Sequence, residues 1–267
     1  MRLGRTEKKY FIIGSVFISV IIICFVLSLL GIGGDPEKTN SAQKLMAPCA
    51  SHLMGTDNLG RDLMARVFAA SKYTLFISVS GVFVALVLGT VAGMLSGYFG
   101  GICDRVIMLL GNTIMCFPGI LLAMVAVAVW GTSMFNVIWA LGLVFAPTFA
   151  RVYRTEVIKV KGYDYILHAK ILGVNPVRIM AVHIFPNVFT QIIPAVVIGL
   201  ANMTLSESAM SYLGLGVQPP KASYGKILSD AQSYIRTAPW LVIFPSLMLV
   251  IYILGLYFVS EGLRGEK

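Results

Sequence analysis

Charged residues are scarce in this sequence. Only 12% of its 267 residues are Asp, Glu, Lys or Arg, whereas a soluble domain carries about 25%. Hydrophobic residues make up 57% of the chain, and the mean hydropathy is +0.83. This composition excludes a soluble globular domain and predicts a protein that crosses the membrane several times.

The chain also lacks the motifs of catalysis and nucleotide binding. No G-x-x-x-x-G-K-[ST] loop is present, so it cannot bind ATP by that route. The three histidines, His52, His168 and His183, form no H-E-x-x-H pair, and the four cysteines show no zinc or redox spacing. No nucleophile is paired with a base, as an intramembrane hydrolase would require. We therefore predict that the chain is not an enzyme and binds no cofactor or metal itself.

Two metal-binding alternatives are weaker. A site could be built from His52, Asp57 and Asp62, but helix capping and helix pairing already account for the two acids. The thirteen methionines could line a route for a soft metal, but methionine more often serves as adaptable packing in a core.

The net charge of +9 raises the question of nucleic acid binding. The Lys and Arg residues, however, lie in the loops between long uncharged runs, where membrane topology places them. We expect a lipid bilayer around the protein and no nucleic acid.

Long apolar runs divide the chain into membrane spans. A spanning helix needs about 20 apolar residues, and the runs cover 10–34, 73–103, 106–150, 187–210 and 237–260. The run 106–150 is long enough for two spans, with a turn at 131–136. The fold class is therefore all-α, with six transmembrane helices. Because the predicted inner segments carry more Lys and Arg than the outer ones, both termini are expected in the cytoplasm.

The predicted organisation follows from these runs. Residues 1–9 form a cytoplasmic N-terminus, 10–34 a retained first span, 35–72 an outer loop, and 73–267 a core of five spans with a cytoplasmic loop at 151–186.

The second half of the outer loop suggests an amphipathic helix on the membrane surface. Thr56, Asp57 or Asn58 could cap it, and Asp62 and Arg66 are spaced as an i, i+4 ion pair. We expect this helix to end near residue 72, before the second span.

Glycine and proline mark the following spans. Gly89, Gly93 and Gly97 repeat every four residues, which predicts a face where another helix approaches closely. Pro118 and Pro147 should kink the helices that contain them.

The longest polar and basic interruption of the apolar core runs from Tyr163 to Pro186, and we call it the elbow. Tyr165, Ala169 and Leu172 fall on one face of a first short helix. Gly173 follows as a helix-ending residue with positive φ. Asn175 and Pro176 then read as an N-cap and a first helical residue.

A second short helix should follow in the elbow. Val177, Met180, Ala181 and Ile184 form its apolar stripe, and Pro186 should end it. Spacing alone leaves two readings open: a connecting loop packed on its own bundle, or a docking site for a partner protein.

Few polar residues lie inside the spans, and they are candidates for a translocation path. Asn112, Asn202 and Glu207 stand out, because an ionisable group inside the membrane is a functional hypothesis by default. Met203 and Met210 flank Glu207 on its span and complete the set. The alternatives are hydrogen bonding between helices for the two asparagines and a structural role near the outer interface for Glu207.

Several separated blocks resemble one known family. They include GTDNLGRD (55–62), YILHAKILGVNPVRIMAVHIFPN (165–187), ESAMSYLGLGVQPPKASYG (207–225) and APWLVIFPSL (238–247). In this order they resemble the second permease of the dipeptide, oligopeptide and nickel branch of ABC importers. The resemblance covers roughly residues 50–264.

The resemblance implies a type I importer permease fold in a bacterial plasma membrane. Its partners would be a homologous permease forming a heterodimer, two cytoplasmic subunits that bind ATP and magnesium, and an external substrate-binding protein. The cytoplasmic loop would be the coupling helix that seats on an ATPase. The residues assigned to this coupling loop are Tyr165, His168, Ala169, Lys170, Leu172, Gly173, Val174, Asn175, Arg178 and Pro186.

The chain departs from the family pattern in two places. Leu167 and His168 replace the Glu-Ala that usually opens the loop signature, and Leu109 and Asn112 replace an Arg and an Asp of the third span. The expected substrate is a di- or oligopeptide, and the alternative is nickel or a metal–opine type of chelate. A self-sufficient secondary transporter is the competing class, but it would need ion sites at broken helices near the membrane centre.

Overall fold

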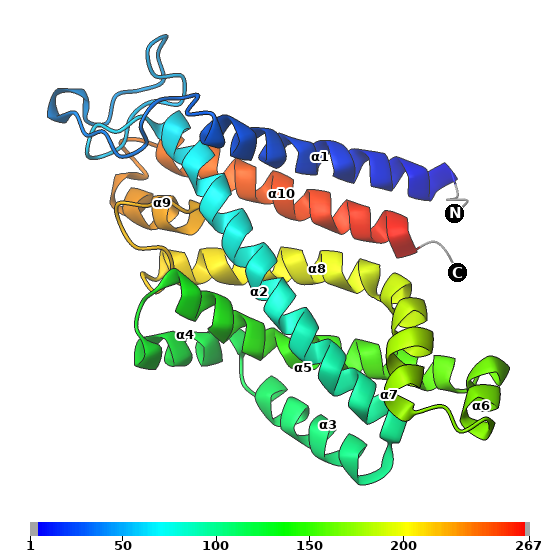
Figure 1. Ribbon diagram of the computed structural model, residues 1–267. Helices are drawn as coiled ribbons and strands as arrows, with labels where there is room; N and C mark the ends of the chain where they lie inside the picture. The colour runs from blue at the N-terminus through cyan, green and yellow to red at the C-terminus, as the bar shows by residue number, and fades with distance from the viewer. Residues whose placement is uncertain (1–4, 265–267) are drawn as a thin grey trace.

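The computed structural model describes residues 5–264, and these residues form helices and connecting loops without a named strand (Figure 1). Residues 1–4 and 265–267, which belong to the predicted cytoplasmic ends, lie outside the described part. The principal helices are α1 (Arg5–Leu29), α2 (Leu63–Phe99), α3 (Gly101–Met115), α4 (Gly119–Trp130), α5 (Met134–Lys161), α6 (Asp164–Ile171), α7 (Pro176–Arg178), the π-helix η2 (Ile179–Ile184), α8 (Phe185–Tyr212), α9 (Tyr224–Ala231) and α10 (Trp240–Arg264). Short 3₁₀ turns lie at Ser41–Gln43 and Gln232–Tyr234.

The number of membrane crossings agrees with the sequence. In the described residues, 5 helices are long and apolar enough to cross a membrane, and the bent pair α3–α4 makes up to 6. The start of α1, the end of α10, the α2–α3 turn and the elbow lie at one end of the bundle, while α9 and the loop after α1 lie at the other (Figure 1). This arrangement matches six crossings in which α1 begins and α10 ends on the side of the elbow, which we call the inner end.

The glycine repeat of α2 packs against α5, as its spacing predicts. A Cβ added to Gly89 would lie 2.5 Å from the Cβ of Phe149, and one added to Gly93 would lie 2.5 Å from the Cβ of Tyr153. Gly97 continues the same contact one turn further along α2. The absence of side chains therefore lets the two backbones meet closely, which favours helix association where lipid supplies no hydrophobic drive.

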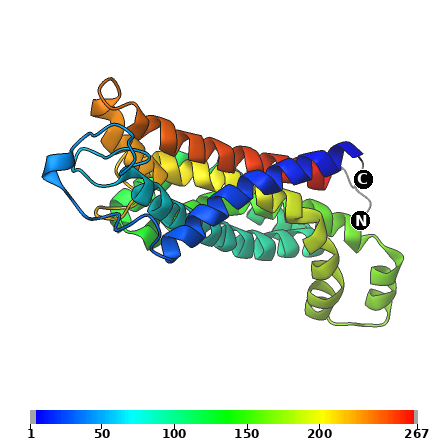
Figure 2. The ribbon, with the colours of Figure 1, turned by 90° about the horizontal axis from the view of Figure 1, so that it is seen from above.

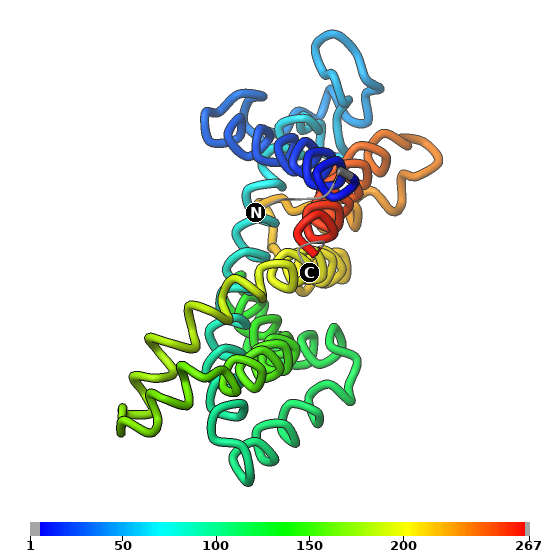
Figure 3. The backbone as a smooth tube through the Cα atoms, turned by 90° about the vertical axis from the view of Figure 1, so that its right-hand side faces the viewer, coloured from blue at the N-terminus to red at the C-terminus, as the bar shows by residue number. Residues whose placement is uncertain are grey.

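The first and last helices form a second close pair. A Cβ on Gly14 of α1 would lie 2.6 Å from the carbonyl oxygen of Gly255 in α10. Viewed from the inner end, α1 and α10 lie on one side of the bundle and α3, α4 and α5 on the other, with α2 crossing between them (Figure 3).

The predicted surface helix before the second span is wrong. The chain becomes helical only at Leu63, which is the first residue of α2, so no separate helix precedes the second span. Its cap is Asp62, whose side chain accepts a hydrogen bond from the N–H of Ala65 at 3.0 Å. Asp62 also lies 2.7 Å from Nδ1 of His52. Because Asp62 serves as the cap, Arg66 does not pair with it and instead lies 3.4 Å from Asp57.

Asp57 organises the loop outside the membrane. Its carboxylate accepts from the backbone N–H groups of Leu59 and Arg61 and from Nε of Arg61 at 2.7 Å. Arg66 links the same carboxylate to Asp230 of α9, at 3.9 Å. We call residues 30–62 together with α9 the outer cap, since these ion pairs join the loop, the start of α2 and α9.

The third span is broken. The chain leaves the helical path at residues 116–118, and α4 leaves α3 at an angle of 87°. Pro118 occupies the N-cap position of α4, which agrees with the expected effect of proline. The turn predicted at 131–136 is present as the short break between α4 and α5.

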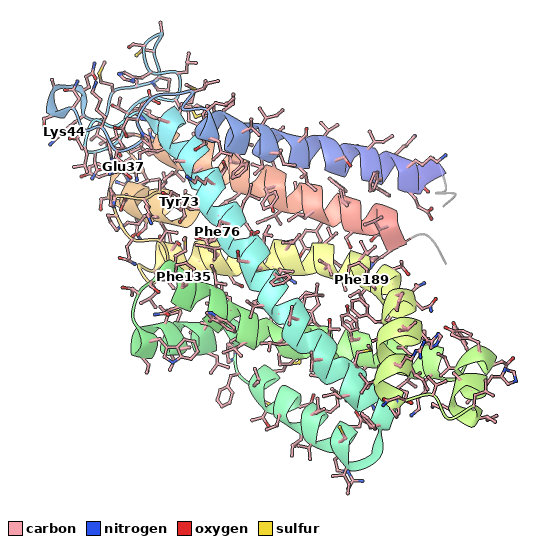
Figure 4. All side chains as sticks on the ribbon, in the orientation of Figure 1. Glu37, Lys44, Tyr73, Phe76, Phe135 and Phe189 are labelled. Atoms are coloured by element: carbon pink, nitrogen blue, oxygen red, sulfur yellow. The ribbon has the colours of Figure 1, made fainter. Side chains whose placement is uncertain are left out.

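Large apolar side chains project from the outside of the bundle. Phe76 of α2, Phe135 of α5 and Phe189 of α8 are labelled examples (Figure 4), and all three are exposed in the isolated chain. A surface of this kind is stable in contact with lipid or with another apolar protein surface.

Candidate functional site: the cytoplasmic elbow

The elbow projects sideways from the inner end of the bundle (Figure 2). It is shorter than the basic loop predicted at 151–186, because α5 continues as a helix to Lys161. The chain then turns, forms α6, turns again at Gly173, and returns toward the bundle through α7 and η2.

A Schellman motif closes α6. The N–H of Val174 donates to the carbonyl of Ala169 at 3.1 Å, and the N–H of Gly173 donates to that of Lys170 at 3.0 Å. Gly173 has φ +75°, as the sequence predicts. Ala169 and Val174 both pack on the apolar cluster beneath the elbow, which completes the motif with its usual apolar contact.

The second helix of the elbow begins as predicted. Asn175 caps it by accepting a hydrogen bond from the N–H of Val177 at 2.8 Å, and Pro176 occupies the first helical position. This cap sets the direction in which the chain re-enters the bundle.

The predicted end of this helix is wrong, and its apolar stripe is only partly right, because Met180 and Ile184 are buried while Val177 and Ala181 are exposed. The chain stays helical from Pro176 to Tyr212, and Pro186 lies in the first turn of α8, directly after the π-helical turn. Residues 179–184 are π-helical. In this wider turn Ile179 and Ile184, five residues apart, are both fully buried, whereas Val177 and Ala181 of the predicted stripe are exposed.

The elbow is anchored to the inner ends of α2 and α5 mainly by apolar side chains. Ile166, Ile179 and Ile184 are completely buried in one cluster with Tyr153 and Val157. Burying an isoleucine side chain stabilises by about 1.5–3 kcal/mol. Sequence periodicity missed Ile166, because its neighbour Tyr165 fits the helical stripe equally well.

Two lysines converge on Tyr98 at the end of α2. Nζ of Lys170 lies 5.0 Å from the centre of the Tyr98 ring and Nζ of Lys161 lies 5.7 Å from it. Lys161 also donates to the carbonyl of Tyr98. The pKa of the Lys170 ammonium is lowered, first by partial burial and then by the charge of Lys161. Lys170 therefore contacts the elbow's own scaffold.

The tip of the elbow exposes apolar side chains. Ile171 is 82% exposed, Leu172 81% and Val177 66%. Tyr165, His168 and Arg178 are also exposed. The elbow is thus a fixed support on one side and an uncovered apolar tip on the other, which is the arrangement of a docking element.

The asparagines of the path set form bonds between helices. Asn112 of α3 accepts from Nη2 of Arg151 in α5 at 2.9 Å. Asn202 of α8 lies 3.4 Å from the hydroxyl of Tyr257 in α10. These contacts are the alternative that the sequence left open for both residues.

The side chains of the other three residues of the path set are buried within the bundle. Met203, Glu207 and Met210 are fully buried. The Glu207 carboxylate accepts from the Ser211 hydroxyl at 2.7 Å and from that of Ser208 at 3.3 Å. The Ser211 oxygen in turn accepts from the N–H of Val217, so Glu207 holds the turn after α8. A path role for the set stays a prediction.

Comparison with known proteins identifies the family. Residues 89–265 match the family model described as "Binding-protein-dependent transport system inner membrane component". The chain is 34% identical over 258 residues to the dipeptide transport system permease protein DppC of Alkalihalophilus pseudofirmus, covering 97% of this chain and 85% of the relative. It is 35% identical to the glutathione transport system permease protein GsiD of Pectobacterium atrosepticum, covering 81% and 72%.

A solved structure supports the fold. An inward-facing structure of the MetNI methionine ABC transporter aligns with a TM-score of 0.60 at 19% identity, covering 74% of this chain and 94% of that one. The likeness confirms the expected ABC importer permease fold. The chain therefore belongs to the family of inner-membrane permease components of binding-protein-dependent ABC importers, as a multi-pass membrane protein.

Proposed function

We propose that this chain is one of two homologous permeases in an importer of di- and oligopeptides. Two ATPase subunits drive it from the cytoplasm, and an external binding protein delivers the substrate. The names of the relatives support the peptide assignment: dipeptide permeases of Alkalihalophilus pseudofirmus and Haemophilus influenzae match over 97% of this chain.

In this proposal the elbow transmits the motion of the ATPases. ATP binding closes the ATPase pair, the elbow moves with them, and the helices joined to it tilt so that the path opens outward. Hydrolysis returns the bundle to the inward-facing state. Transport of this kind needs two arrangements of the bundle and an external bias between them.

The observation that carries the proposal is the exposed apolar tip. Ile171 and Leu172 are more than four-fifths exposed, yet the helix that presents them is closed by a Schellman motif and anchored through Ile166. A cytoplasmic groove of an ATPase would cover these side chains and gain their burial. Leu172 supplies apolar contact in this arrangement, and Arg178 supplies polar contact.

The docking role of the elbow tip can be tested by introducing a charged side chain there. In Leu172→Asp we expect the chain to insert normally but to lose co-purification of the ATPase subunits and to lose peptide uptake, because a carboxylate cannot enter an apolar groove without a partner. The matched control is Leu213→Asp at the outer end, where the leucine is also exposed. It should leave ATPase co-purification unchanged. Undiminished co-purification in Leu172→Asp would contradict the docking role.

The substrate is tested separately. The chain, purified with its partner subunits and binding protein and reconstituted in vesicles, should take up radiolabelled dipeptides only with ATP inside. Uptake of nickel or a metal chelate, with none of dipeptides, would replace the peptide assignment. Accumulation by vesicles containing this chain alone would favour a secondary transporter instead.

A further inference from the structure

Arg151 is a charged side chain inside a membrane-spanning helix without an acidic partner. Its Nη2 donates to the amide oxygen of Asn112 at 2.9 Å and lies 3.4 Å from the sulfur of Met115. Among residues 5–264 no carboxylate pairs with it. Arg154, three residues further along α5, instead holds both oxygens of Asp104 in α3.

The Arg151 guanidinium lies on the outer side of the ion pair between Arg154 and Asp104, which joins α5 to α3 near the inner end. Asn112 is eleven residues into α3 from the inner turn at Gly101, which is about 17 Å along a helix. The apolar core of a bilayer is about 30 Å thick. Side chains on a helix lean toward its N-terminus, so Arg151 leans away from the cytoplasm. Its hydrogen bond to Asn112 lies one helical turn, about 5 Å, further from the inner end of the bundle than the Arg154–Asp104 pair.

The break in the third span lies beside this charge. Residues 116–118 interrupt the helix directly after Met115, and all three are exposed in the isolated chain. Non-helical backbone at membrane depth is stable only where protein or a water-filled cavity covers it. The break therefore indicates that this face of the bundle, which Arg151 adjoins, does not meet lipid.

An apolar cavity adjoins Arg151. Its volume is about 330 Å³, and it lies between α2, α3 and α5. Leu88, Ile107, Leu143 and Pro147 are among its lining residues, together with Asn112 and Arg151. The cavity therefore offers apolar surface with one cation and one amide at its edge.

We propose that Arg151 is a specificity-determining residue that binds the carboxylate of the transported solute, while the adjoining cavity receives an apolar side chain. This inference rests on the proposed peptide transport. A guanidinium matches a carboxylate with two parallel hydrogen bonds, and Asn112 leaves most of the five N–H donors available. The terminal carboxylate of a peptide with apolar side chains supplies both parts of this ligand.

A comparison with the neighbouring Arg154 explains why Arg151 is the arginine that remains available to bind substrate. The carboxylate partner of Arg154 is already present in α3, so Arg154 is neutralised within the chain and holds α3 against α5. One turn further from the inner end, the amide of Asn112 orients the Arg151 guanidinium without cancelling its charge. The site can thus attract an anion and release it, as passage through the membrane requires.

The test compares two probes in the complete reconstituted transporter. Uptake of alanyl-leucine, with a free carboxylate, is measured against uptake of alanyl-leucine amide, in the wild type, Arg151→Gln and Arg151→Lys. We expect Arg151→Gln to lower uptake of the free acid about tenfold or more, relative to the amide, because a hydrogen bond to a charged group is lost. Arg151→Lys should fall between the two. The matched control is Arg105→Gln, which changes an exposed arginine near the inner end of α3, the helix that carries Asn112.

Each outcome decides the matter. The binding protein is the same in every sample, so its own preference cancels when variants are compared. Equal losses for acid and amide, or loss of the second permease from the purified complex, would make Arg151 an interface residue and overturn the proposal. An unchanged ratio would overturn it as well. If the wild type moves neither peptide, the proposed peptide function fails first, and this inference fails with it.

Discussion

The two ends of the molecule are attached to the bundle in different ways. The outer cap is held by buried charges in addition to apolar contacts: Asp57 and Arg66 are nearly inaccessible, and Asp57 pairs with both Arg66 and Arg61. In the elbow no ion pair is present among the residues that the structure describes, and Ile166, Ile179 and Ile184 hold it by burial.

This difference sets what each end can do. A buried ion pair loses several kcal/mol when its partners separate, because each charge is left without water or counterion. The outer cap, α9 included, must therefore move as one body with the start of α2. Apolar contacts are not directional, so the elbow can tilt against α2 and α5 without leaving a charge unpaired. The predictions below test whether charge fixes one end and apolar burial the other.

The largest effect is expected at Asp57. In Asp57→Ala, Arg61 would remain buried without a carboxylate and Arg66 would keep only Asp230, 3.9 Å away. Such a loss costs about 3–5 kcal/mol. We expect a large fall in the melting temperature of the purified complex, and strong proteolysis of the loop 30–62. Asp230→Asn is the control, because Asp230 is partly exposed and lies 3.9 Å from Arg66. A melting temperature like that of the wild type in Asp57→Ala would mean that charge does not fix the outer cap.

A smaller effect is expected in the apolar anchor of the elbow. Ile184→Ala should destabilise by about 2–5 kcal/mol, as other large-to-small core changes do. The loss should appear as faster amide hydrogen exchange over residues 163–186 and lower uptake, while the outer cap stays protected. Val182→Ala, two residues away and exposed, should change neither. Faster exchange in the outer cap would show that the two ends are not independent.

Local backbone signals in the sequence predicted the elbow well. Gly173, Asn175 and Pro176 each act through their own backbone, so their positions alone indicate where a helix ends or begins. The glycine repeat of α2 was equally clear, because a helix face of small residues has one common use in a membrane.

The predictions that were wrong concern features that depend on contacts between distant segments of the chain. The π-helical turn at 179–184 shifts the buried face by one residue, and only packing of Ile179 and Ile184 on α2 and α5 selects it. Asp62 was predicted to pair with Arg66. Instead, Asp62 accepts the N–H of Ala65 as the helix cap, and Arg66 pairs with Asp57. The 87° turn in the third span exceeds what a proline kink predicts. The hydrogen bond between Arg151 and Asn112 becomes visible only when α3 and α5 are placed together.

The smallest effect in stability, with the sharpest effect in function, is expected at Gly173. Its φ of +75° costs an L-residue about 1–2 kcal/mol, and nothing lies within 4 Å of an added Cβ. Gly173→Ala should therefore lower the free energy of unfolding only by the cost of the positive φ. Gly173→Asn should lower it less, because asparagine tolerates this conformation. Gly173→Glu adds a charge beside the apolar tip, so it should insert normally but abolish uptake and ATPase coupling. Measuring binding-protein-stimulated ATPase activity in all three separates backbone strain from the charge. Normal coupling in Gly173→Glu would refute the elbow as the ATPase contact, while a loss in Gly173→Ala equal to that in Gly173→Glu would assign the effect to the bend alone.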